Sequence, residues 1–399
     1  MDQENRRSGT EGATLLGQAV QAYRAALEIF SLRADPTTWA VTQGALGSAL
    51  QSQGVRIGGP QALALLEQSA QAFRAALEVF TKADYPQDWA TTQHNMGNTL
   101  EDRGERLGGA EGRGLLGQAV QALKAALEVR TRADLPQGWA STQYNLGLAL
   151  GALGERSTGA EADALLDQSV QAHRAALDVF TRGDLPYDWA RTQHGLGVSL
   201  DRRAEASAGA VADSFRAQAT QAFRAALEVR TKEALPQDWA TTQGQLGVVL
   251  ERQAERTAGP EAVTLLDQAV QAFRAALEVR TKDTLPQPWA RVQIDLGVAL
   301  RAQGQRTRGA QGLALLTQSA QAYRAALDVF TKPDFPERWA LTQYHLGSTL
   351  RSQARRSPGP ESVPLIGESV KAQRAALRYT RRRATPVCGP QRSEALAKP

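Results

Sequence analysis

The sequence predicts an all-α protein, a solenoid of antiparallel helix pairs with about 15 helices. A segment that begins with Trp returns every 50 residues in seven copies, without insertion or deletion, and it holds all 7 tryptophans of the chain. A second segment, rich in Ala, Leu and Gln, recurs with the same period between these copies. No stretch alternates between apolar and polar residues as a half-buried strand does. A fixed period of this length indicates a repeat architecture, and the missing strand pattern makes it helical.

The Trp segment is expected to form the first helix of each pair, over roughly 36–54 in the first period. In that copy, Trp39, Gln43, Leu46 and Leu50 follow one another at steps of four, three and four residues, which places them along one helical face. A proline lies three residues before every Trp, where the first turn of a helix tolerates it because its missing N–H needs no partner there.

The second segment is expected to form the second helix, over roughly 61–82 of the same period. Its first copy in the chain carries Leu16, Val20, Tyr23 and Leu27 at helical spacing, and most of its other residues are strong helix formers. This segment has eight copies against seven of the Trp segment, so a lone helix of the second type, at roughly 12–33, opens the array.

The chain is expected to have three parts. Residues 1–11 are polar and are expected to be disordered, residues 12–383 form one elongated solenoid in which each repeat packs on its neighbours, and residues 384–399 form a flexible basic tail. The formal net charge is +5, and residues 361–399 alone hold eight Lys or Arg against three acids, so residues 1–360 balance to zero. This balance argues against nucleic-acid binding along the array.

The repeat resembles the tetratricopeptide repeat (TPR), although its period is 50 residues rather than about 34. The positions that carry the resemblance are Gln43, Leu46, Gly47 and Leu50 in the first helix, Ala19, Tyr23 and Ala26 in the second, and Pro36. Gln stands where the family has Trp, and Leu where it has Tyr. The resemblance implies a right-handed superhelical solenoid whose first helices line a concave surface. It also implies a non-catalytic scaffold or adaptor that binds a partner protein or peptide on that surface.

The sequence shows no pattern of residues that catalysis or a cofactor would require. Its four histidines have no metal-ligand spacing with one another or with Cys388, the single cysteine. No glycine-rich phosphate loop follows a strand, and no nucleophile stands beside a plausible base. We therefore expect no enzyme activity, no metal and no cofactor. The polar N-terminus lacks the apolar core of a signal peptide, no apolar run reaches membrane-spanning length, and one cysteine suits the reducing cytoplasm.

Three columns of the repeat are constant in all seven copies of the first helix. The Trp column lies on the apolar stripe and is expected to pack between helices rather than to stack on a ligand. The Gly47 column costs about 1 kcal/mol against Ala in a helix, which indicates close approach of a neighbouring helix. The Gln43 column is expected to bond backbone groups of the adjoining helix end, because a buried amide needs partners. A ligand role for this Gln is the alternative.

The columns that vary most are also those where the resemblance places ligand contacts, and they begin at Val41, Gly44, Ala45, Ser48, Gln51 and Ser52. Basic residues exceed acidic ones in the later copies, so the expected partner carries acidic segments. The predicted groove residues are His94, Asn95, Tyr144, Asn145, Arg191, His194, Arg252, Arg291, Arg301, Tyr344, His345 and Arg351. Neutral drift at exposed positions is the alternative to a selected groove. The alternative function is a regulator that responds to a peptide or small effector by a change in superhelix shape.

The two ends of the array differ in composition. The last helix carries Lys371, Gln373 and Arg378 where other copies have Gln, an aromatic residue such as Tyr23, Phe73 or Phe223, and an acid, so this end is expected to be solvated. The first helix keeps Phe30 and has Leu32 where later copies have Lys or Arg. An apolar end predicts self-association or partner docking there, and residues 1–11 folding over it is the alternative.

Overall fold

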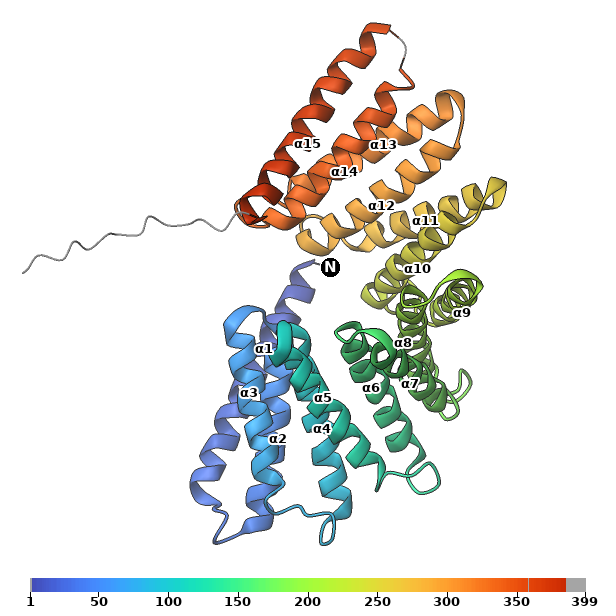
Figure 1. Cartoon of the computed structure of the whole chain (residues 1–399). Coiled ribbons are helices and arrows are strands. Elements are labelled where there is room, and N and C mark those ends of the chain that lie inside the picture. The colour runs from blue at the N-terminus through green and yellow to red at the C-terminus, as the bar shows by residue number, and fades with distance from the viewer. Residues whose placement is uncertain (1, 358, 385–399) are drawn as a thin grey trace, which may run out of the picture. The chain divides into compact units, whose positions relative to one another are not determined.

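The computed structural model describes residues 2–357 and 359–384, and in these it contains fifteen α-helices, one short 3-10 turn and no strand (Figure 1). The all-α prediction is therefore confirmed for the described residues. The contacts divide the chain into two compact units, Met1–Val229 (unit 1) and Arg230–Pro399 (unit 2), and each is described by itself below. The division falls between α9 and α10, inside the span 12–383 that the sequence presented as one array.

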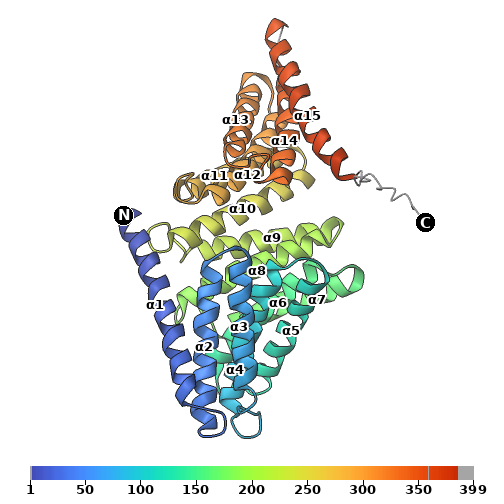
Figure 2. The same ribbon diagram turned by 90° about the vertical axis from the view of Figure 1, so that its left-hand side faces the viewer.

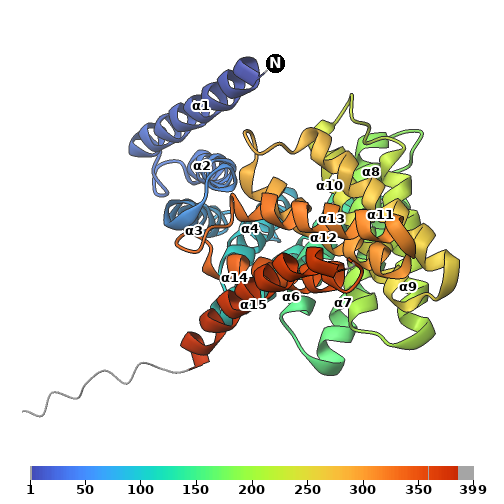
Figure 3. The same ribbon diagram turned by 90° about the horizontal axis from the view of Figure 1, so that it is seen from above.

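The helices follow the predicted order of one lone helix and seven pairs. Unit 1 contains α1 (Asp2–Ile29), α2 (Pro36–Arg56), α3 (Gly59–Ala76), α4 (Pro86–Arg106), α5 (Gly109–Leu127), α6 (Pro136–Glu155), α7 (Gly159–Leu177), α8 (Pro186–Glu205) and α9 (Gly209–Leu227). Unit 2 contains α10 (Pro236–Arg256), α11 (Gly259–Val279), α12 (Pro286–Arg306), α13 (Gly309–Leu327), α14 (Pro336–Ala354), the 3-10 turn Gly359–Glu361 and α15 (Ser362–Ala384). Within unit 1, α2, α3 and α4 lie side by side, and α1 packs on α2 (Figures 2 and 3).

Helix bounds agree with the sequence at the prolines and differ at two other places. The second helices end earlier than expected, at Ala76 rather than near residue 82, because the chain tightens into i to i+3 bonds such as Glu78 N to Ala75 O. The expectation that residues 1–11 are disordered is wrong for residues 2–11, which continue α1. Once a helix has formed, each added residue gains a hydrogen bond without a new nucleation cost. The predicted tail 384–399 lies outside the described residues beyond Ala384.

The glycine column of the first helices marks the closest contact within each pair. A Cβ on Gly197 of α8 would lie 2.7 Å from Cε1 of Phe223 on α9, which is 1% exposed. Equivalent clashes arise at Gly47 with Phe73 and at Gly247 with Phe273. The interpretation of this column as a site of close helix approach is confirmed.

The tryptophans are half-buried, and their exposed ring faces lie under cations. Lys82 Nζ lies 5.7 Å from the ring centre of Trp89 and 2.6 Å from Glu128 Oε2 of the next second helix. The ring contact recurs between Arg132 and Trp139, Arg182 and Trp189, Lys232 and Trp239, Lys282 and Trp289, and Lys332 and Trp339. This ladder explains why Leu32 stands out, since it occupies the place of the cation before Trp39. Exposed ion pairs of this kind contribute at most about 1 kcal/mol each.

The Gln43 column is half-buried throughout the seven first helices. At Gln93 the expectation of a backbone bond is wrong for the side-chain oxygen, because Gln93 Oε1 has no hydrogen-bond partner. Gln93 faces a shallow hollow lined by Arg74, Gln118 and Gln121, on the side of the second helices.

Candidate functional site

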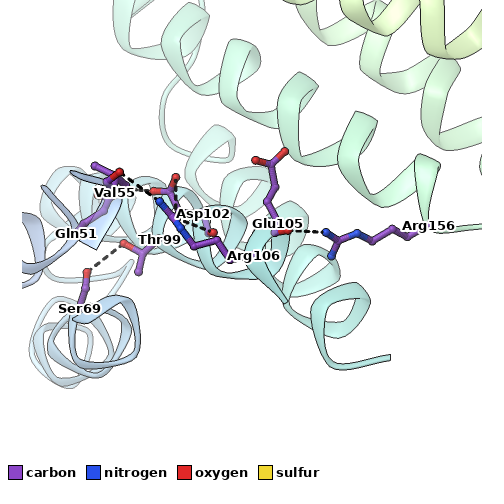
Figure 4. A network of polar contacts seen from close by, with 8 residues as sticks. All are labelled: Gln51, Val55, Ser69, Thr99, Asp102, Glu105, Arg106 and Arg156. Atoms are coloured by element: carbon purple, nitrogen blue, oxygen red, sulfur yellow. Dashed lines mark hydrogen bonds and ion pairs between the residues drawn. The ribbon is translucent and has the colours of Figure 1, made fainter. Parts of the chain in front are cut away.

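In unit 1, polar side chains tie the C-terminal ends of neighbouring first helices together (Figure 4). Gln51 Nε2 donates to Asp102 Oδ2 over 2.9 Å, and Arg106 Nη1 donates to the backbone oxygen of Asp102 over 3.0 Å. Arg156 Nη2, just after α6, donates to the backbone oxygen of Glu105 over 2.9 Å. Burial raises the pKa of Asp102, against the bond from Gln51 and the charge of Arg106. Asp102 is thus engaged in packing between α2 and α4.

Two of the predicted groove residues, His94 and Asn145, bond each other. The Thr142 hydroxyl donates to Gly138 O over 2.7 Å, so His94 Nδ1, 3.0 Å from Thr142 Oγ1, must be the donor in that contact. The unprotonated Nε2 then accepts from Asn145 Nδ2 over 3.3 Å. Burial, followed by the charges of two nearby guanidinium groups, lowers the pKa of His94 to about 4. His94 is 8% exposed and offers little surface to a partner.

Three further predicted residues of unit 1 are held by contacts within the unit. Arg191 Nη2 lies 3.0 Å from Asp188 Oδ1, and its guanidinium carbon lies 4.4 Å from the ring centre of Tyr144. His194 meets Phe223 edge to face, with ring centres 5.5 Å apart.

In unit 2, the predicted residues of α14 surround a buried tyrosine. The His345 ring stacks on Tyr323 of α13 at 5.6 Å and 11°, and Tyr344 meets His345 edge to face at 5.7 Å. Burial, and then the charge of Arg301, lowers the pKa of His345. Tyr344 is 55% exposed, and Arg351 is also exposed, so both remain accessible on the surface of the unit.

Arg291 borders a pocket of about 360 Å³ between α10 and α12 in unit 2. Its walls are formed by Thr241, Gly244, Gln245 and Val248 of α10, by Gln287, Pro288, Arg291, Val292 and Asp295 of α12, and by Arg280, Phe330 and Arg338. Three arginines and one carboxylate therefore share one hollow, which we call the arginine pocket.

The charged groups of the arginine pocket are positioned by their neighbours. Arg280 Nη2 donates to Thr241 Oγ1 over 2.8 Å, and the guanidinium carbon of Arg338 lies 5.2 Å from the ring centre of Phe330. Burial raises the pKa of Asp295 to about 6, although four arginines oppose the shift. These four are Arg291, Arg252, Arg338 and Arg280. The predicted residue Arg252, which lies on α10, thus opposes the rise in the pKa of the same carboxylate.

The same hollow exists four periods earlier without the arginines. A pocket of about 190 Å³ between α2 and α4 is lined by Gly44, Phe80, Thr91 and Asn95, at the positions of Gly244, Arg280, Arg291 and Asp295. We call it the Gly44 pocket, and the predicted residue Asn95 lies in its wall. In the second repeat, the glycine position holds His94, which is packed against α6. A glycine in this column therefore opens the hollow, and the other columns decide its charge.

Sequence reasoning found Arg291 and missed Arg280 and Arg338. Arg280 lies just after a second helix, in a column that holds Phe in the first, second, fourth and seventh copies, Arg in the third, fifth and sixth, and Thr in the eighth. That alternation between Phe and Arg was the available signal, although the resemblance places ligand contacts on the first helices alone. Arg338 lies in the first turn of α14, where its place beside the arginine pocket depends on the packing of α14 against α12.

The two ends of the array both expose apolar side chains. On α1, Leu15 is 58% and Ile29 77% exposed, while Leu32 is 42% exposed and Phe30 is half-buried. The expectation that the last helix is the solvated end is wrong, because α15 exposes Ile366, Val370 and Leu377. These side chains lie on the face that the next first helix covers in inner pairs. Self-association through the N-terminal end stays a prediction.

None of the helices described combines the length and apolar character that a membrane span requires. In the same residues, no group of three or more His, Cys, Asp or Glu is placed to hold a metal ion. No family model matches the chain, and neither does any curated protein sequence. Its structure is similar to that of a circular tandem repeat protein with novel repeat topology and enhanced subunit contact surfaces. The two share 14% identity over 95% of this chain and 93% of the other, with a TM-score of 0.34.

Proposed function

We propose that this protein is a non-catalytic scaffold or adaptor of TPR-like type, which binds an acidic segment of a partner protein on the face formed by its first helices. The arginine pocket carries this proposal, because it gathers Arg280, Arg291 and Arg338 on that face. Guanidinium groups bind carboxylates through paired N–H donors. Residues 1–360 balance to zero, but residues 230–360 around the pocket hold 17 Lys or Arg against 12 acids, so unit 2 as a whole suits an acidic partner. We place this function in the cytoplasm, where one cysteine would stay reduced.

Binding of fluorescein-labelled hexapeptides tests the proposal. Hexaglutamate is expected to bind, hexaserine and hexalysine are not, and affinity for hexaglutamate is expected to fall several-fold between about 50 mM and about 300 mM salt. An Arg291→Glu, Arg301→Glu variant is expected to weaken hexaglutamate binding, since both changes reverse cations beside the first-helix face of unit 2. Equal binding of the three peptides, or an affinity indifferent to salt and to both substitutions, would show that the proposed function is wrong.

A second function is favoured by the size of the arginine pocket. Its volume of about 360 Å³ lies within the range of roughly 300–1,000 Å³ common for small-molecule sites. The protein would then be a regulator that responds to a small acidic effector by a change in the shape of the array. Small-angle X-ray scattering with and without glutarate distinguishes the two, because a scaffold keeps its radius of gyration and an effector-responsive regulator changes it.

A further inference from the structure

The hollow between α10 and α12 exists because of one residue. Gly244 has no side chain, and a Cβ built on it would have only Arg280 Nη1 within 4 Å, at 3.9 Å. The imidazole of His94 occupies the equivalent position in the second repeat and bonds across to Thr142 of the next first helix. In the sixth repeat the residue equivalent to Thr142 is Val292, which offers no hydroxyl to such a ring or to Arg280. The hollow beside Gly244 therefore adjoins N–H donors of Arg280 that no neighbouring hydroxyl on residue 292 can accept.

The charge of the arginine pocket suits an anion, and its apolar walls suit an aliphatic stem. Three guanidinium groups and one carboxylate, Asp295, leave two positive charges in excess on its walls. A planar carboxylate matches the two parallel N–H donors of a guanidinium fork. A doubly charged phosphate would match the forks as well, and the three guanidinium groups would attract it more strongly even as Asp295 repels it more, so charge alone does not separate it from a carboxylate. The remaining walls include Val248, Pro288 and Phe330, which can cover a short aliphatic stem.

We infer that the arginine pocket is a carboxylate site, which takes a carboxylate on a short aliphatic stem between Arg280, Arg291 and Arg338, as in a glutamate side chain. The inference rests on the proposed function where the carboxylate belongs to a protein segment. A free dicarboxylate has the same chemistry and is the other source.

The test uses the chain's own repeats as templates. Gly244→His fills the arginine pocket with the side chain found at His94, and Arg280→Phe gives it the wall found at Phe80. Gly44→His fills the Gly44 pocket in the same way and is the matched control. Fluorescence anisotropy with labelled hexaglutamate is expected to show affinity weakened about tenfold or more by the first two changes. The Gly44→His control is expected to change it less than about twofold. Circular dichroism melting of each variant checks that it folds. If Gly244→His does not fold, Arg280→Phe still tests the carboxylate site.

Competitors identify the source and the anion. Displacement of labelled hexaglutamate by free glutarate supports a carboxylate site open to small dicarboxylates, and displacement by unlabelled hexaglutamate alone supports a peptide side chain. Displacement by inorganic phosphate at lower concentration than glutarate overturns the carboxylate assignment. If hexaglutamate binds the wild type, Gly244→His and Gly44→His alike, the proposed function survives and the carboxylate site does not. If calorimetry finds glutarate bound but no hexaglutamate, the site survives and the scaffold function fails.

Discussion

Replacing His173 by phenylalanine is expected to stabilise unit 1 by roughly 2 kcal/mol at pH 7, because a buried polar atom without a partner costs about 1–3 kcal/mol. His173 is 0% exposed, and its Nε2 has no hydrogen-bond partner, while Nδ1 lies 3.0 Å from Ser169 O. Phe73 and Phe223 occupy the same column over the same glycine column, so the larger ring has a native precedent. The urea midpoint followed by circular dichroism measures the gain.

The advantage of His173→Phe is expected to grow in acid. Burial lowers the pKa of His173 to about 4, against an ordinary value of 6.5. The unfolded chain therefore takes up a proton near pH 6.5 that the folded chain refuses until pH falls to about 4, so this group removes stability as pH decreases through that window. At pH 5 the variant is expected to gain roughly 2 kcal/mol more than at pH 7. The reverse change, Phe223→His, is expected to create the same acid sensitivity one pair later. An equal effect of either variant at both pH values would contradict the assignment.

Replacing Glu101 by glutamine is expected to stabilise unit 1 by roughly 2 kcal/mol at pH 8, since one pKa unit corresponds to about 1.4 kcal/mol and partial solvation reduces the full shift. Burial, and then the charges of Glu105 and Asp102, raises the pKa of Glu101 to about 8, although Arg202 and Arg106 oppose the shift. Glutamine keeps the shape of the side chain and removes the charge.

The pH dependence of Glu101→Gln has the opposite sign to that of His173→Phe. The folded chain holds a proton on Glu101 between pH 4.5 and about 8 that the unfolded chain has lost, so wild-type stability falls as pH rises through this window. The gain from glutamine is therefore expected to be largest at pH 8 and to vanish near pH 4.5. Gln51 is the native residue in this column of the first repeat, and Gln51→Glu is expected to destabilise the protein at pH 8, beside Asp102. A gain that does not change between pH 4.5 and 8 would exclude titration of Glu101 as its cause.

The sequence was sufficient for the helices because the signals that set them are local. Pro36 and its equivalents fix where each first helix begins, and the step from Trp39 to Gln43 and Leu46 fixes its buried face. The end of each second helix was less predictable. It depends on a change from α-helical hydrogen bonds, which span four residues, to 3-10 hydrogen bonds, which span three, and no residue type marks this change. The sequence did not predict that residues 2–11 belong to α1, because these residues are polar and show no apolar face that would pack on another helix.

The candidate site was harder to predict because it depends on distances between repeats. His94 and Arg191 vary between copies as ligand contacts would, yet the structure shows them bonded within unit 1. Arg291 was found because it lies on a first helix. Its companion Arg280 lies at the end of the preceding helix, α11, and only the packing of α11 against α12 brings the two to one hollow. Variation at a column therefore does not by itself distinguish a ligand contact from an inter-repeat contact.

The central claim is that a glycine opens the hollow and that the arginines around it make it bind carboxylate. Its most direct test is to give the Gly44 pocket two of the three arginines with a Phe80→Arg, Thr91→Arg, Thr92→Val variant, in which the third change removes the hydroxyl that Val292 lacks in the arginine pocket and so leaves the donors of the new arginine free. Isothermal titration calorimetry with hexaglutamate is expected to report one site in the wild type and two in this variant. A variant that folds like the wild type and still binds a single hexaglutamate with unchanged affinity would contradict the claim.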